Sequence, residues 1–307
     1  MGYDPFAPGP FAVGVRAGIA IDKTRNDRPL PFEVWYPESA GGGRHPFIAY
    51  CHASFGHKRQ SAYLSTHLAS HGYVVAAADH TGNAAADFVE RTQRRAAGQV
   101  PTPEEADAYL RRIIDDRVPD LRFLIDHILG GAVDRVSAAI DERRIGLIGW
   151  SFGGWAVLAT PEVDERVAAV VALAPAGNSK PLPGIIPATL TFAWSREVPT
   201  LYLVAERDRF TPLIGEYELL ERTPSRKRMF ILEGADHQHF DDQIVDPGPC
   251  SPEHAHTFTR GLSLAHLDAV LRSDRDAERF MEGDPAAALR ERGVNAIDHS
   301  IGSPTET

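Results

Sequence analysis

The sequence has little cysteine, no excess of positive charge and no long apolar run. Cys51 and Cys250 are the only cysteines in 307 residues, too few for a disulfide-stapled scaffold, so we expect free thiols. A net charge of −10 disfavours nucleic acid as a partner, because nucleic-acid binding requires a basic face. No segment has the ~18 consecutive apolar residues of a membrane span, and the N-terminal residues lack a basic and apolar leader. We therefore expect a soluble, cytoplasmic protein that binds a small molecule and no membrane; the sequence leaves monomer and homodimer open.

Eight short segments are rich in strand-favouring residues, and helical stretches lie between most of them. Segments 13–21 and 30–36 flank a charged turn and predict an antiparallel entry hairpin. The other six are apolar throughout, which is typical of parallel strands buried on both faces: 46–51, 73–78, 145–149, 167–173, 200–205 and 229–232. Helices are predicted at 61–70, 118–129, 155–159 and 214–222. The alternation predicts a doubly wound α/β fold with a mostly parallel sheet of about eight strands.

Residues 81–119 are too long for a simple connection and predict an insertion after the fourth strand. Within it, Thr102 followed by Pro103 and Glu105 indicates the N-cap and first turn of a helix. The charged residues of the insertion, among them Arg91, Arg94 and Arg95, are expected on a solvated helix face. We assign residues 1–275 to a single domain that includes insertion 81–119, and residues 276–307 to a C-terminal helical extension with a disordered tail.

One pentapeptide, Gly149-Trp150-Ser151-Phe152-Gly153, follows an apolar strand and opens a helical stretch. In this strand–turn–helix context, a glycine-x-serine-x-glycine motif presents the serine hydroxyl above the sheet. Glycines are required on either side because side chains there would collide at so sharp a turn. The motif predicts that Ser151 is a nucleophile.

A serine nucleophile needs a histidine base and an acid that orients the histidine, and in this kind of fold they follow in the order Ser, Asp, His. Asp208 lies at the carboxyl end of the predicted seventh strand and is the predicted acid, with Glu206 as the alternative. His237 follows the eighth strand and is the predicted base. The nearby His239 is predicted to be structural.

The histidines of this region also suggest a metal site as an alternative. Its ligands would be two histidine pairs and two aspartates: His237, His239, His254, His256, Asp241 and Asp242. We expect no metal at these residues, because the nucleophile motif already accounts for the histidine loop.

Ester cleavage also requires N–H donors for the tetrahedral oxyanion. Phe152, next to the nucleophile, is predicted to supply one donor, and Ser54 or Phe55, after the third strand, the other. The insertion is expected to wall the substrate pocket and to restrict it to small or medium acyl groups. The predicted substrate-binding residues are Trp150, Tyr109 and Ile113. The last two belong to an apolar stripe whose members are expected to pack mostly on the body: Ala106, Tyr109, Leu110, Ile113 and Ile114.

Several motifs together resemble the dienelactone-hydrolase-like bacterial serine esterases of the α/β-hydrolase superfamily, which are related to platelet-activating-factor acetylhydrolases. The motifs stand at 52–56, 68–75, 79–80, 149–154 and 234–237, within a resemblance that covers about residues 13–271. Cutinase-type polyester hydrolases share parts of the pattern. The resemblance implies an α/β-hydrolase fold, a Ser-Asp-His triad, and no metal or organic cofactor.

Two positions depart from these families. True dienelactone hydrolases have a cysteine at the nucleophile position, where this chain has Ser151, and relatives carry glycine where this chain has Ala53. The predicted function is therefore that of a serine hydrolase, which cleaves a small or medium carboxylic ester through an acyl-serine intermediate. Two alternatives stay open: an acyltransferase that uses the same triad, and a non-catalytic binding protein that has kept the fold.

Overall fold

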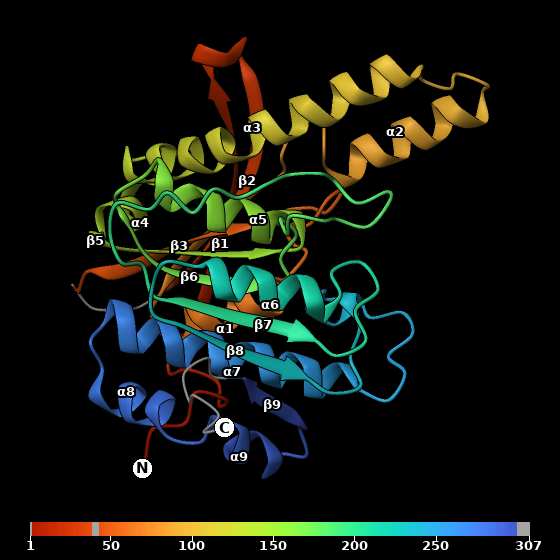
Figure 1. Ribbon diagram of the computed structural model, residues 1–307. Helices are drawn as coiled ribbons and strands as arrows, with labels where there is room; N and C mark the ends of the chain where they lie inside the picture. Colours follow the sequence, from red (N-terminus) through yellow and green to blue (C-terminus); the bar gives the residue numbers. More distant parts are fainter. Residues whose placement is uncertain (1, 39–42, 300–307) are drawn as a thin grey trace.

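The computed structural model describes residues 2–38 and 43–299, and in this part of the chain nine strands form one sheet (Figure 1). Across the sheet the strands follow the order β1-β2-β4-β3-β5-β6-β7-β8-β9. The strands are β1 (Val13–Asp22), β2 (Arg28–Pro37), β3 (His45–Cys51), β4 (Val74–Ala78), β5 (Ile140–Trp150), β6 (Val167–Leu173), β7 (Thr200–Ala205), β8 (Lys227–Leu232) and β9 (Ala296–His299). The strands β3 to β8 run parallel, whereas β1, β2 and β9 pair antiparallel with their neighbours. The predicted mostly parallel sheet with an N-terminal hairpin is confirmed.

Helices cover both faces of the sheet (Figure 1). They are α1 (Ala62–Ser70), α2 (Ala85–Ala96), α3 (Pro103–Leu129), α4 (Asp134–Ala138), α5 (Phe152–Ala159), α6 (Leu213–Arg222), α7 (Pro252–Leu271), α8 (Arg275–Glu282) and α9 (Pro285–Arg290). Buried side chains of α3, α5 and α6 form one core with the sheet, and those of α1 and α7 form the other. Strand β3 shows why two cores arise: Phe47 and Ala49 enter the first, and Ile48 and Tyr50 enter the second. No helix within the described ranges is long and apolar enough to cross a membrane.

The C-terminal region contributes a ninth strand that the sequence analysis did not predict. Strand β9 pairs antiparallel with β8, and Leu289 and Val294 just before it are buried in the second core. The extension that begins at residue 276 is therefore part of the same packed body as far as residue 299. The predicted disordered tail, at residues 300–307, lies outside the described residues.

Helix α7 was also not predicted, although it is 20 residues long. Polar side chains on its buried face, including Thr259, Ser263 and Asp268, interrupt the apolar pattern from which a helix is recognised. The helix is stabilised by its packing against the sheet rather than by a clean apolar stripe.

The insertion folds as a helical arm made of α2 and the first half of α3, which projects from the body (Figure 1). As predicted, Thr102 caps α3: its hydroxyl accepts the Glu105 N–H (3.2 Å), and the Glu105 carboxylate accepts the Thr102 N–H (2.8 Å). Residue 119 is not the end of the insertion, because α3 continues through Pro119. One lost backbone hydrogen bond at Pro119 is outweighed by the burial of Ile113 and Leu121 on either side in one core.

Candidate active site

Ser151 lies at a sharp turn between β5 and α5, where its backbone is held in an unusual conformation. Its dihedral angles are φ 57° and ψ −117°, in a region that residues with side chains seldom adopt. The flanking glycines make the turn possible. A Cβ atom on Gly149 would lie 2.2 Å from the Gly153 oxygen, and one on Gly153 would lie 2.0 Å from the Cys51 oxygen. The motif is therefore a steric requirement of this turn.

Asp208 follows β7 and is buried, with its carboxylate fully hydrogen-bonded. One oxygen accepts the backbone N–H groups of Phe210 (2.8 Å) and Thr211 (2.9 Å). The other accepts the Thr211 hydroxyl (2.8 Å) and lies 2.6 Å from Nδ1 of His237. The alternative acid, Glu206, is instead on the surface, where it accepts the Gly234 N–H (2.7 Å). The structure thus places Asp208, and not Glu206, beside His237.

These contacts determine the charge of Asp208 and the tautomer of His237. Burial by itself would raise the pKa of Asp208, but the hydrogen bonds and charge of His237 and the hydrogen bonds from Thr211 hold it below its ordinary value. The carboxylate is ionised at neutral pH and only accepts hydrogen bonds, so Nδ1 of His237 carries the proton. The Nε2 atom is left as the basic nitrogen of the ring.

His237 begins the short 3₁₀ helix His237–Phe240, in the loop after β8. Its ring lies between two aromatic side chains, with centroid distances of 5.4 Å to Trp150 and 5.2 Å to Phe210. The aromatic neighbours and the Asp208 bond together restrict the orientation of the imidazole.

Ser151 and His237 both line a cavity of about 480 Å³ above the carboxyl ends of the strands. The three predicted substrate-binding residues also line it: Trp150, Tyr109 and Ile113. The other walls are mainly apolar and come from the arm and from irregular segments, among them Leu110, Phe210, Ile185 and Ile186. We call this space the ester cavity. The insertion does form part of its wall, although Ile113 is also buried in the first core.

The loop after β3 faces the same cavity and presents one backbone donor. The Phe55 N–H, which was one of two candidates for an oxyanion donor, already binds the Asn83 oxygen (3.2 Å), and the Ala53 N–H binds the Gln60 side chain (2.9 Å). In the described part of the chain, the Ser54 N–H has no such acceptor. Phe152 is the first residue of α5, so its N–H also lacks an intrahelical partner. Both Ser54 and Phe152 line the cavity.

A buried arginine, Arg117 of α3, contacts both elements that carry these N–H donors, the loop with Ser54 and the helix that begins at Phe152. It is 1% exposed, donates to the His52 oxygen (2.7 Å) and to the Asn83 side chain, and lies 4.5 Å above the Phe152 ring. Asn83 in turn donates to the Ser54 hydroxyl (3.2 Å). Arg117 thus contacts both the loop after β3 and the first residue of α5.

Behind the loop, Cys51, His80 and Asp120 form a second series of hydrogen-bonded groups. The Cys51 sulfur lies 3.2 Å from Nε2 of His80, whose Nδ1 lies 3.2 Å from Asp120. Burial by itself would raise the pKa of the Cys51 thiol, but the positive charges of His80 and Arg117 hold it below its ordinary value. All three side chains are 2% exposed or less, so a substrate in the cavity does not reach this thiol.

Two other histidines of the suggested metal site, His239 in the same loop and His256 in α7, have partners within the protein. His239 is buried, and its Nε2 atom lies 3.1 Å from the carbonyl oxygens of both Pro247 and Cys250. Nε2 of His256 binds the Asp241 oxygen (2.9 Å). No group of three or more His, Cys, Asp or Glu side chains in residues 2–38 and 43–299 is arranged to hold a metal ion.

Several wall residues of the cavity were not predicted. Phe210 and Thr211 come two and three residues after Asp208, and a threonine three residues after an aspartate is a recognisable signal of a turn capped by the carboxylate. Ile185 and Ile186 lie in an irregular segment between β6 and β7, which has no periodic pattern. Nothing in the sequence around those two residues pointed to the cavity.

A parallel sheet that leads into a strained serine turn, with an Asp–His pair carried by later loops, defines the α/β-hydrolase class of proteins. Within this class, the chain belongs to the dienelactone hydrolase family, whose model matches residues 33–244.

The chain is also similar to platelet-activating factor acetylhydrolases of mammals. It is 23% identical to the Bos taurus protein in an alignment of 311 positions, gaps included, that covers 87% of this chain and 67% of that protein. It is 24% identical to the Canis lupus familiaris protein in an alignment of 270 positions that covers 79% of this chain and 55% of that protein. The chain thus spans between about half and two thirds of the length of these relatives. The resemblance to cutinase-type polyester hydrolases stays a prediction.

Proposed function

We propose that this protein is a serine hydrolase that cleaves small or medium carboxylic esters through an acyl-serine intermediate. The observation that carries the proposal is the bond between Asp208 and His237 at the wall of the cavity that also contains Ser151. The names of the family and of the relatives point to the same reaction class.

In the first half of the reaction, the Ser151 hydroxyl attacks the ester carbonyl and transfers its proton to Nε2 of His237. Asp208 stabilises the imidazolium that forms. The N–H groups of Phe152 and Ser54 donate to the oxyanion of the tetrahedral intermediate. The imidazolium then protonates the departing alcohol, and the acyl group stays on Ser151.

In the second half, water takes the place of the alcohol. His237 accepts a proton from the water as it attacks the acyl carbonyl, and the second tetrahedral intermediate uses the same two donors. Its collapse releases the carboxylic acid and returns the proton to Ser151. An alcohol acceptor in place of water would make the same site an acyltransferase. Product analysis with and without added acceptor alcohol therefore tests whether the released product is the acid.

Asp208→Asn tests the role of the acid. The amide of the variant can donate a hydrogen bond to Nδ1 of His237, which favours the tautomer with the proton on Nε2. That nitrogen can then no longer accept the proton of Ser151, so we expect kcat to fall by about 10⁴-fold. Glu206→Gln is the matched control, since it removes a carboxylate from the same loop that does not contact His237. Rates for 4-nitrophenyl butyrate measured on both variants provide the comparison. Equal losses in the two variants would contradict the assignment of Asp208.

The size of the ester cavity predicts a preference among neutral acyl chains. At about 480 Å³ it is in the lower half of the ~300–1,000 Å³ range of ligand pockets, and its walls are mainly apolar. We expect kcat/KM for a series of 4-nitrophenyl esters to be highest for short and medium chains and to fall beyond about ten carbons. A steep rise in kcat/KM toward the palmitate ester would show that the cavity does not limit the length of the acyl chain.

A further inference from the structure

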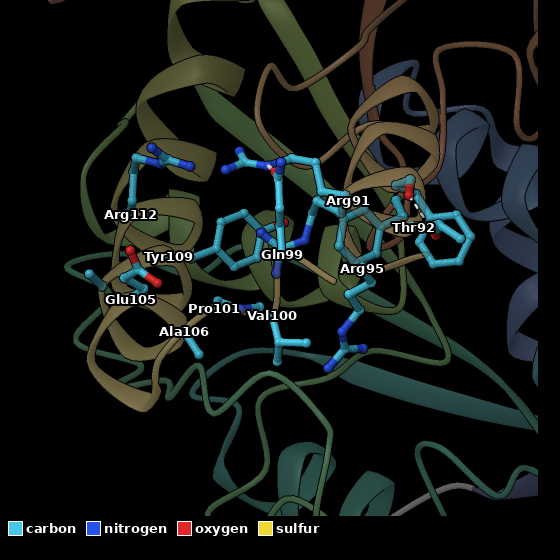
Figure 2. Close-up of a pocket in the computed structure, with 14 residues that line it drawn as sticks. Arg91, Thr92, Arg95, Gln99, Val100, Pro101, Glu105, Ala106, Tyr109 and Arg112 are labelled. Carbon is cyan, nitrogen blue, oxygen red and sulfur yellow. Dashed lines mark hydrogen bonds between the residues drawn. The ribbon is translucent and has the colours of Figure 1, made fainter. Parts of the chain in front are cut away.

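A second cavity, of about 880 Å³, lies between α2 and α3 of the arm (Figure 2). We call it the arm cavity. It is next to the ester cavity, because Phe55, Arg91, Ala106 and Tyr109 line both. A molecule whose ester group lies at Ser151 can therefore place its far end in the arm cavity.

The arm cavity is positively charged, although the protein as a whole has a net charge of −10. Four arginines line it: Arg91, Arg94, Arg95 and Arg112. None of them forms an ion pair with a carboxylate of the described residues. The one acid in the wall, Glu105, is already used to cap the Thr102 N–H (2.8 Å). A hollow whose wall carries four positive charges and one negative charge concentrates counter-ions of the minority sign, so this one attracts anions.

Arg91 is held in position at the boundary of the two cavities. Its guanidinium lies 3.7 Å from the centroid of the Tyr109 ring, and that of Arg112 lies 5.6 Å from the same centroid. The Tyr109 hydroxyl donates to the Gly82 oxygen (3.0 Å) and accepts a hydrogen bond from Asn83 (3.3 Å), so the ring is fixed. Figure 2 shows Arg91, Arg112 and Tyr109 together among the residues that line the arm cavity.

Stacked guanidinium groups keep their N–H edges available for hydrogen bonds to an anion. Arginine edges match the two oxygens of a carboxylate or a phosphate, and such charge-assisted bonds are stronger than neutral ones. The apolar side chains of Phe55, Phe88 and Val100 in the same walls suit the carbon chain that would lead to the anion. The combination differs from the purely solvated helix face that the sequence predicts for Arg91.

Given the proposed ester hydrolysis, we propose that the substrate is an ester with a carboxylate or phosphate group at a distance from the scissile bond. Arg91, together with Arg112 and Arg95, binds this anionic group in the arm cavity while the ester lies against Ser151. The anionic group and the ester thus occupy different cavities. A chain too long for the ester cavity is accepted when it ends in an anion, whereas a neutral chain of the same length is not.

The test compares matched esters. The anionic series consists of mono-4-nitrophenyl esters of glutaric, adipic, suberic and sebacic acids, and the neutral series of 4-nitrophenyl esters with the same numbers of acyl carbons. For at least one length we expect kcat/KM of the anionic ester to exceed that of its neutral match by about tenfold. The advantage should shrink as salt concentration rises, because the arginines are partly exposed.

Two variants that each remove one positive charge distinguish an effect of the arm cavity on kcat/KM from an effect of the protein's overall charge. Arg91→Gln should abolish the anionic advantage. Arg111→Gln is the matched control, because Arg111 is exposed on α3 of the same arm but does not line either cavity. It should keep the advantage. Equal kcat/KM for the two ester series in the unmodified protein, at every length, would overturn the inference while leaving ester hydrolysis established.

A binding measurement makes the test independent of turnover. With Ser151→Ala protein, calorimetric titration of adipate and of inorganic phosphate should detect at least one of them, and Arg91→Gln should weaken that binding by about tenfold. The stronger of the two titrations identifies carboxylate or phosphate as the preferred group. Because Phe88 and Val100 are exposed apolar side chains, a membrane surface is the competing partner for the arm. If neither anion binds and Arg91→Gln instead reduces binding to vesicles of anionic lipid, the arm is a membrane contact and the substrate proposal is wrong.

Discussion

Ser151→Ala is expected to lower kcat for ester cleavage by about 10⁶-fold, because the variant has no nucleophile to form the acyl intermediate. The fold should persist. The Ser151 hydroxyl forms no hydrogen bond with the described residues, and alanine occupies the same strained backbone position at similar cost. We therefore expect the free energy of unfolding in urea to change by less than about 0.5 kcal/mol. Burst kinetics with 4-nitrophenyl butyrate measure the activity.

The control for this experiment is Ser179→Ala, which changes an exposed serine outside both cavities and should keep the activity of the unmodified protein. An organophosphonate should modify Ser151 alone, as mass spectrometry of peptides would show. Turnover by Ser151→Ala at a rate near that of the control would rule out the acyl-serine mechanism. The mechanism would also be contradicted if Ser151→Ala lost all activity but the organophosphonate had no effect on the unmodified protein.

His237→Ala should cause a loss of similar size, since removal of either the nucleophile or the base of a triad disables it as a unit. The matched variant is His239→Ala, two residues along the same loop. His239 is 1% exposed and binds two backbone carbonyl groups, so its loss leaves buried acceptors without a donor. We expect His239→Ala to unfold at a lower temperature and to retain most of its kcat at temperatures where it is folded.

The two outcomes are separated by measuring kcat and thermal unfolding on the same samples. The assignment of the base predicts that His237→Ala loses activity without a matching loss of stability. If His239→Ala loses as much kcat while still folded, His239 takes part in the reaction. The bond between Asp208 and His237 would then be structural.

The sequence predicted the parts of the fold that depend on local patterns. Six apolar segments became the parallel strands β3 to β8, because strands buried on both faces must be apolar throughout. It did not predict β9, whose four residues include one buried side chain, Ala296. A strand of that kind exists because β8 offers it an edge to pair with. The insertion was predicted to end at residue 119, but α3 continues through Pro119, since packing on both sides overrides the helix-breaking preference of one residue.

For the site, the sharp turn at Ser151 could be predicted because its glycine requirements fall within five residues of chain. The turn at Ser151 needs a strand before it, a helix after it and no side chains at Gly149 and Gly153. The expected order Ser, Asp, His along the chain limited the candidates for the acid to Glu206 and Asp208. It limited those for the base to His237 and His239. Steric rules of the backbone act over short distances, so they are visible in the sequence.

Tertiary structure alone decided between candidates that are close in sequence. Glu206 and Asp208 stand two residues apart on one loop, and the direction of each side chain is determined by Gly234, Thr211 and His237. The Phe55 N–H, unlike the Ser54 N–H, is likewise occupied only because the Asn83 oxygen lies within hydrogen-bond distance. The arm cavity depends on the way α2 and α3 bring Arg91 over Tyr109. These contacts join residues distant along the chain, and their free energy comes from packing that no local pattern encodes.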